Sequence, residues 1–206
     1  MEYVPNILFA LALIAGIGFF VRNVKKLTRN IKLGKDVDVS DNKAQRWKNM
    51  ARIALGQTKM VVRPIAGIMH VIVYVGFIII NIEVLEIILD GLLGTHRLFS
   101  PLGSVYNFLI GSFEILALLV IVAVIVFWVR RNIIRIQRFI KPEMKGWPKT
   151  DGNLILYIEL VLMVLFLTMN AADFQLQQMG AEHYNRAGAF PVSQFLLPLL
   201  EGLSES

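Results

Sequence analysis

The sequence contains no cysteine and only three histidines among its 206 residues. The absence of cysteine excludes a disulfide, a zinc site with cysteine ligands and an iron–sulfur cluster held by this chain alone. Charged residues make up only 17% of the chain and hydrophobic residues 56%, which is a composition typical of membrane proteins. The sequence also lacks the H-E-x-x-H, G-x-S-x-G, P-loop and GxGxxG patterns, so the common motifs of soluble enzymes give no indication of its function.

Four long apolar segments dominate the sequence instead. A helix rises 1.5 Å per residue, so about 20 apolar residues cross a hydrocarbon core about 30 Å thick. We therefore expect an all-α integral membrane bundle, a single domain with transmembrane helices at roughly 3–22, 64–93, 107–129 and 153–172. The apolar stretch 195–200 is too short to span and predicts an interfacial C-terminal segment. The chain stops where a further helix could begin, as expected for part of a longer protein.

The basic residues are distributed unevenly between the connections. Twelve of the 21 Lys and Arg lie in 22–63 and seven in 130–149, whereas Arg97 and Arg186 alone lie in the other two connections. Basic connections stay on the cytoplasmic side of a membrane. We therefore expect cytoplasmic loops at 23–63 and 130–151 and both termini outside. The basic residues behind the net charge of +6 are concentrated in these two loops, where they indicate membrane topology. We therefore expect no nucleic-acid partner.

One histidine lies inside the second apolar segment. Gly67, His70, Tyr74, Phe77 and Asn81 follow one another at steps of three or four and share one helical face. An ionisable side chain within a membrane helix marks a candidate functional site, and the small Gly67 leaves room for a flat group. A histidine that hydrogen-bonds to a neighbouring helix explains the same pattern.

Four carboxylates also fall within the apolar segments: Glu83, Glu86, Glu114 and Glu159. Burying an ionised carboxylate in hydrocarbon is costly, so each should be neutral, paired or in contact with water. Glu83 and Glu86 could pass protons to or from a quinone. The alternative is that Glu86, Asp90 and Glu114 lie near the outer interface and are hydrated, which we expect for Glu114.

His96 is a second candidate metal ligand, at the outer end of the second helix. It follows His70 by 26 residues, about 39 Å of helix, so the two cannot hold the same metal ion. A solvated loop histidine explains His96 equally well, and His183 is expected to be an ordinary loop residue.

The connection after the first helix carries Arg46, Lys48, Arg52 and Lys59. These residues predict either a solvated connector with a short interfacial helix, or a basic surface that docks a soluble partner or binds anionic groups.

Residues 46–99, RWKNMARIALGQTKMVVRPIAGIMHVIVYVGFIIINIEVLEIILDGLLGTHRLF, carry a resemblance to a known family. They resemble the membrane cytochrome b domain of the respiratory nitrate reductase gamma subunit, in the versions joined to heterodisulfide-reductase-like iron–sulfur proteins in Bacteroidetes. The matching pieces are 54–57, Arg63-Pro64, Gly67, His70, 76–77 and 83–91, and the resemblance extends over most of the chain.

The resemblance implies electron transfer through b-type heme, in the bacterial inner membrane, between a cytoplasmic iron–sulfur or flavin partner and quinone as substrate. In that case His70 is an axial ligand of the heme iron, Gly67 leaves room for the porphyrin, and Arg63 and Lys59 pair with the propionates. Iron–sulfur clusters would belong to a partner or to a missing C-terminal part.

The sequence departs from the family pattern in its histidines. The pattern has two histidines about ten residues apart on the second helix, but Ile80 stands at that spacing here. The opposing ligands lie on a fifth helix, which this chain does not have. Either the missing ligand lies beyond residue 206, or the chain is a cofactor-free membrane anchor or scaffold. A small transporter or channel is a third possibility, which internal repeats or broken helices would favour.

The predicted topology can be tested with single cysteines in this cysteine-free chain. Ser40→Cys and Thr150→Cys should be protected from an impermeant thiol reagent in intact cells, whereas Ser104→Cys should react. Labelling of Ser40→Cys together with protection of Ser104→Cys would reverse the orientation.

Overall fold

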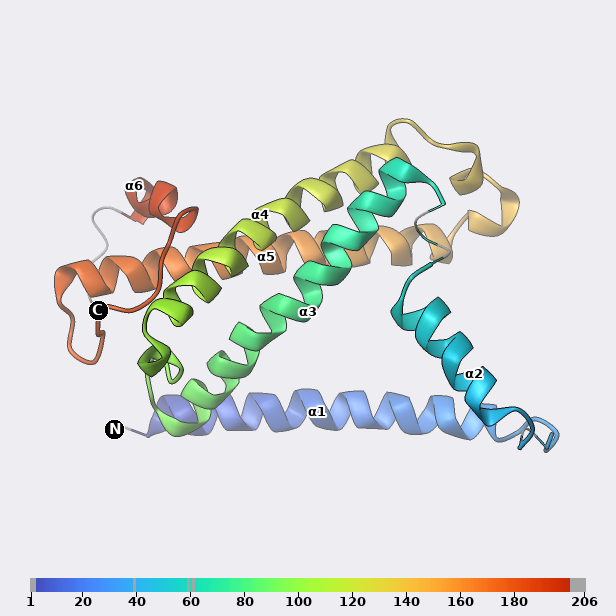
Figure 1. Ribbon diagram of the computed structural model, residues 1–206, viewed down its shortest axis with the longest axis horizontal. Coiled ribbons are helices and arrows are strands. Elements are labelled where there is room, and N and C mark those ends of the chain that lie inside the picture. The colour runs from blue at the N-terminus through green and yellow to red at the C-terminus, as the bar shows by residue number, and fades with distance from the viewer. Residues whose placement is uncertain (1–2, 39, 59, 61, 201–206) are drawn as a thin grey trace. The chain divides into compact units, whose positions relative to one another are not determined.

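The computed structural model describes residues 3–38, 40–58, 60 and 62–200, and these residues form helices and turns without a strand (Figure 1). Four of the described helices are long and apolar enough to cross a membrane: α1 (Val4–Ile31), α3 (Pro64–Leu93), α4 (Ser104–Asn132) and α5 (Trp147–Met179). The predicted all-α class with four membrane-spanning helices is therefore confirmed. The shorter helices are α2 (Lys43–Met50), which continues as one π-helical turn over Ala51–Leu55, and α6 (Leu197–Leu200).

The first and last spanning helices extend further than the apolar segments. α1 continues to Ile31, because the charged residues after Val21 do not interrupt a helix. The positive charge of Arg29 in the last turn also interacts favourably with the negative end of the helix dipole. α5 begins at Trp147 rather than near residue 153, with Pro148 in its first turn. Proline lacks the backbone N–H that a first turn leaves unpaired anyway, so Pro148 starts this helix instead of ending one.

The chain divides into two compact units, residues 1–59 with 87–95 and residues 60–86 with 96–206. In the first unit, the Asn6 side chain donates a hydrogen bond of 2.8 Å to the Gly91 carbonyl. The Phe9 ring lies close to Gly91: a Cβ atom added at Gly91 would be 2.6 Å from Cε1 of Phe9. Glycine at position 91 therefore allows α1 to pack tightly against the last turns of α3.

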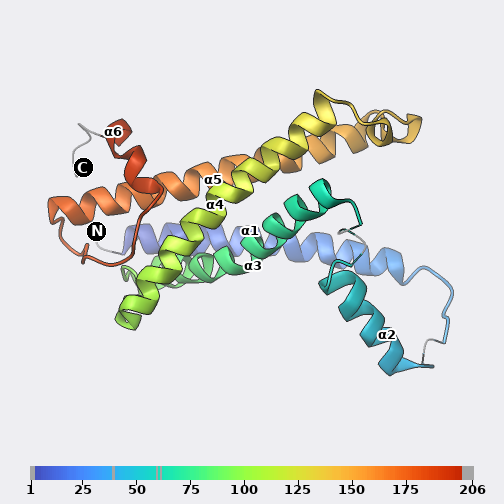
Figure 2. The same ribbon diagram turned by 45° about the horizontal axis from the view of Figure 1, so that its top comes forward.

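The second unit contains α4, α5 and most of α3, with α4 and α5 side by side in both views (Figure 2). Its core consists mainly of apolar and aromatic side chains from the three helices and the last connection: Ile80, Tyr106, Ile110, Phe113, Ala117, Phe166, Leu167 and Phe190. α3 approaches α4 at Gly76, where a Cβ atom would lie 2.7 Å from Cγ2 of Val120. Small residues commonly allow such close contact between membrane helices.

The C-terminal segment folds onto α4 and α5. A 3₁₀ turn at Ser193–Leu196 leads into α6, and Ser193 donates its hydroxyl to the Leu167 carbonyl at 2.9 Å. Glu114 of α4 accepts the backbone N–H groups of Val192 and Ser193 at 2.8 and 3.1 Å. The expectation that Glu114 is hydrated is wrong, because its side chain is completely buried and caps this segment.

The packing at Gly76 leads to a stability prediction. Gly76→Leu should lower the free energy of unfolding by about 1–3 kcal/mol, because the new side chain must displace the buried and stiff Val120. Gly16→Leu is the matched control, since nothing lies within 4 Å of a Cβ at Gly16. Thermal unfolding in detergent would measure both variants. Equal melting temperatures for the two would contradict the close contact.

Candidate functional site

His70 lies beside a cavity of about 270 Å³ in the second unit. Its ring packs against the Phe127 ring of α4, with 4.6 Å between the centroids, and its side chain remains exposed on the other side. The lining residues come from α3, α4, α5 and the connection between α4 and α5: Arg63, Ala66, His70, Phe127, Arg130, Arg131, Ile136, Arg138, Phe139, Gly152 and Leu156. None of these described lining residues is acidic, so the cavity suits an anion with an apolar body.

Arg131 is the best-fixed of the four arginines in this cavity. It donates to the carbonyls of Pro148 and Lys149 at 2.9 and 3.2 Å, and its guanidinium lies over the Phe139 ring at 5.1 Å. Gly152 makes room for it, because a Cβ at that position would be 2.5 Å from the Arg131 Nη2 atom. The buried Nε of Arg131 has no hydrogen-bond partner among the described residues.

The structure brings some of the predicted site residues together. His70 and Arg63 line the same cavity, and Gly67 is buried on the same helix. Lys59 lies outside the described residues. Phe77 and Asn81, which share the helical face in the sequence, are exposed, and the Asn81 amide bonds back to the Phe77 carbonyl.

Sequence reasoning missed the contribution of three arginines to the His70 cavity: Arg130, Arg131 and Arg138. They lie some 60 residues after His70 and look like ordinary topology signals in the sequence. The absence of acidic residues from 130–140 was the only clue that they gather around an anion site.

A bis-histidine heme would need two imidazoles, and among the described residues only one, that of His70, lies at this cavity. His70 offers one exposed imidazole, Phe127 an aromatic wall, and the arginines a cationic rim for propionates. The cavity is smaller than the roughly 300–1,000 Å³ typical of small-molecule sites, so a macrocycle would extend along the exposed side of His70. His96 cannot be a second ligand opposite His70. It binds Asp173, and Asp173 lies about 31 Å further along α5 than Gly152, which lines the His70 cavity.

A second polar site lies at the other end of the second unit, about 20 Å along α3 from His70. We call it the Arg97 network, and its members are Glu83, Glu86, His96, Arg97, Tyr106, Asn170, Asp173 and Gln177. Arg97 is only 7% exposed and has a left-handed backbone, with φ at 54°. A non-glycine residue holds such a conformation only where its surroundings compensate for the strain.

Arg97 uses all three of its side-chain nitrogens. Nε and Nη2 donate to Oδ2 of Asp173 at 2.9 and 2.7 Å, and Nη2 also donates to Asn170 at 2.8 Å. Nη1 donates to Glu83 at 2.9 Å and to the Tyr106 hydroxyl at 3.4 Å. Burial alone lowers the pKa of the Arg97 guanidinium, but the carboxylates of Asp173 and Glu83 outweigh it, and the net shift of this pKa is upward. Arg97 is therefore a permanent buried cation.

The remaining members attach the network to neighbouring segments. Glu86 accepts from the Phe99 backbone N–H and from the Tyr106 hydroxyl, both at 2.7 Å. Glu86 is 2% exposed, so the alternative that it is hydrated does not hold. His96 binds Asp173 through Nε2 at 2.6 Å, and its ring packs at a tilt against the Tyr184 ring, with 4.5 Å between the centroids. This bond occupies one of the two His96 nitrogens, and the described residues contain no cluster of side chains able to hold a metal ion.

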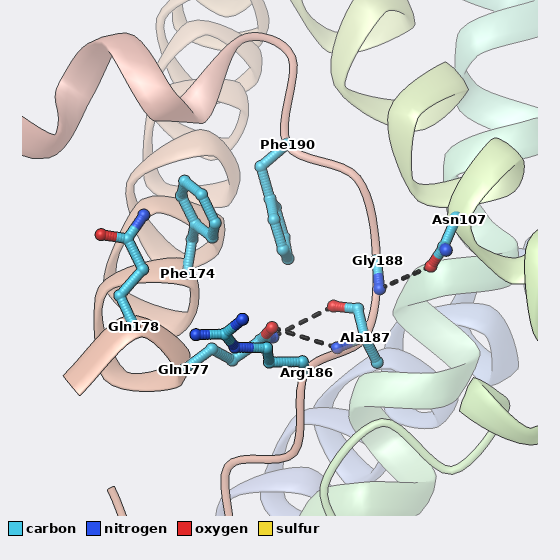
Figure 3. Close-up of a pocket in the computed structure, with 8 residues that line it drawn as sticks. All are labelled: Asn107, Phe174, Gln177, Gln178, Arg186, Ala187, Gly188 and Phe190. Carbon is cyan, nitrogen blue, oxygen red and sulfur yellow. Dashed lines mark hydrogen bonds between the residues drawn. The ribbon is translucent and has the colours of Figure 1, made fainter. Parts of the chain in front are cut away.

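A cavity of about 620 Å³ lies next to the Arg97 network (Figure 3). Gln177 joins the two, because it donates to Asp173 and exchanges two hydrogen bonds with the backbone of Ala187, all at 3.1 Å. Figure 3 shows the Phe174 and Phe190 rings as neighbours, and they stack at 5.1 Å. Phe190 also lies beneath the Arg97 guanidinium at 5.5 Å. The connection between α5 and the 3₁₀ turn, residues 180–192, therefore covers the network.

In comparisons with known proteins, no protein-family model, no curated protein and no solved structure matches the chain.

The Arg97 network predicts a large effect of a single substitution. Arg97→Ala should lower the free energy of unfolding by about 3–5 kcal/mol, because it leaves buried carboxylates without their cation. Arg97→Lys should restore little, since an ammonium group cannot reproduce the three-nitrogen donor set. Arg186→Ala is the control, because Arg186 is exposed. Denaturation in mixed micelles would measure all three, and a stability of Arg97→Ala close to that of Arg186→Ala would contradict the role of the network.

Proposed function

We propose that this chain is a membrane electron-transfer subunit that passes electrons between a cytoplasmic iron–sulfur or flavin protein and membrane quinone. A b-type heme, when bound, supplies one-electron transfer in such a subunit. The observation that carries the proposal is the position of His70, an imidazole within a membrane helix, beside a cavity with four arginines and no described acidic lining residue.

The residues of the cavity have distinct roles in this proposal. When a heme is bound, His70 would hold its iron, and neutral imidazole is the form that binds iron. The exposed side of the His70 ring leaves space for a flat ligand. Arg63, Arg130, Arg131 and Arg138 bind the propionates, and Arg131 is fixed for this by its two carbonyl partners. The second axial ligand comes from outside the described residues.

The orientation and the partner also belong to the proposal. The arginine cavity and the exposed α2 both carry positive charge, and basic segments favour the cytoplasmic side of a membrane, so we infer that both face the cytoplasm at the bacterial inner membrane. Exposed basic residues of α2, such as Arg46 and Lys48, then attract an acidic redox partner. A specific observation favours a second candidate function, a cofactor-free anchor or scaffold, since the described residues hold no second imidazole that could face His70.

The reduced-minus-oxidised visible spectrum of the natural full-length protein tests the proposal. We expect the sharp bands of a low-spin heme in the wild type and their loss in His70→Ala, with membrane insertion unchanged. His183→Ala is the control, because this exposed histidine lies far from the cavity along the chain. A wild type without these bands would favour the anchor, and full heme content in His70→Ala would remove His70 from the site.

A further inference from the structure

The Arg97 network contains more acidic groups than cations. Its carboxyl groups are Glu83 and Glu86 of α3 and Asp173 of α5, and each is at most 8% exposed. Arg97 is its one permanent cation, and His96 is the only other member that can carry positive charge. Tyr106 of α4 adds a hydroxyl group, and the Tyr184 ring packs against His96. Full ionisation of all three carboxyl groups would leave uncompensated negative charge in a buried site, which is costly.

Asp173 takes most of the charge compensation that Arg97 offers. It accepts two hydrogen bonds from the guanidinium, one from His96 at 2.6 Å and one from Gln177 at 3.1 Å. Charge-assisted bonds of this kind favour the ionised form of a carboxyl group. Asp173 and Arg97 therefore form the ion pair at the centre of the network.

Glu83 and Glu86 differ although they lie three residues apart and are both almost fully buried. Each oxygen of Glu86 accepts a hydrogen bond, one from Phe99 and one from Tyr106. Glu83 accepts through Oε1 from Arg97, whereas its buried Oε2 has no hydrogen-bond partner among the described residues. A buried carboxylate oxygen without a donor is unfavourable, and a proton on that oxygen removes the charge that makes it so.

We propose that Glu83 is a proton-binding residue whose Oε2 carries a dissociable proton at neutral pH. Oε1 still accepts the hydrogen bond from Arg97 in this state. On release, the Oε2–H bond breaks, the proton passes to water, and the carboxylate pairs with Arg97, which keeps all its own protons. His96, whose side chain is 20% exposed, is the member of the network nearest to water. The proposal does not depend on a bound heme.

Infrared spectroscopy of the protein in lipid bilayers tests this proposal. A protonated carboxyl group gives a carbonyl band above the amide bands, which shifts in D₂O and falls as the pH is raised. We expect Glu83→Gln to remove a component of this band that corresponds to one carboxyl group. Glu86→Gln is the matched control, because Glu86 is equally buried on the same helix but has a donor for each oxygen.

If Glu83→Gln does not insert into the membrane, labelling of wild type with [¹³C]glutamate separates glutamate bands from aspartate bands. The wild-type-minus-variant differences for Glu86→Gln, Glu114→Gln and Glu159→Gln give the components of those three residues, and removing these components from the glutamate band of the wild type leaves that of Glu83. The proposal is overturned if Glu83→Gln keeps the full band, if Glu86→Gln removes the component instead, or if the subtraction leaves no glutamate band at neutral pH.

Discussion

The fold of the second unit depends on the interactions of one buried guanidinium group, that of Arg97, with three membrane helices. A buried cation is tolerated only where anionic and polar partners surround it. α3, α4 and α5 each supply partners, Glu83, Tyr106 and Asp173, so the position of Arg97 fixes the ends of three helices together. The left-handed backbone at Arg97 shows that the connection bends to fit the network. The network thus determines where the helices meet at this end of the unit.

The two ends of the second unit have different chemistry. The His70 end gathers four arginines and no described acidic residue around its cavity, and Gly152 is there to accommodate Arg131. The other end gathers three carboxyl groups around one arginine. About 20 Å of α3 separates His70 from Glu83, so the two proposed sites, one for an anion and one for a proton, do not share side chains.

The sequence predicted the number of spanning helices because about 20 consecutive apolar residues have few alternatives to a membrane helix. It also indicated His70 as a candidate site residue, because an imidazole is unusual in such a segment, and this stays a prediction. It did not predict the contacts of His70 or Arg97, because Phe127 and Asp173 lie 57 and 76 residues further along the chain and only packing brings them near. The expectation that Glu114 is hydrated failed because the sequence does not show that a later connection folds over it, where its buried carboxyl group accepts a backbone N–H group.

The central claim, that Arg97 and Asp173 form the ion pair that fixes the second unit, is tested most directly by a double-mutant cycle. The free energies of unfolding of Arg97→Met, Asp173→Asn and the double variant would be compared with that of the wild type. Residues in direct contact have coupling energies of about 0.5–3 kcal/mol, and we expect a value in the upper half of this range. Additivity within about 0.3–0.5 kcal/mol would show that the two side chains act independently and would contradict this account of the fold.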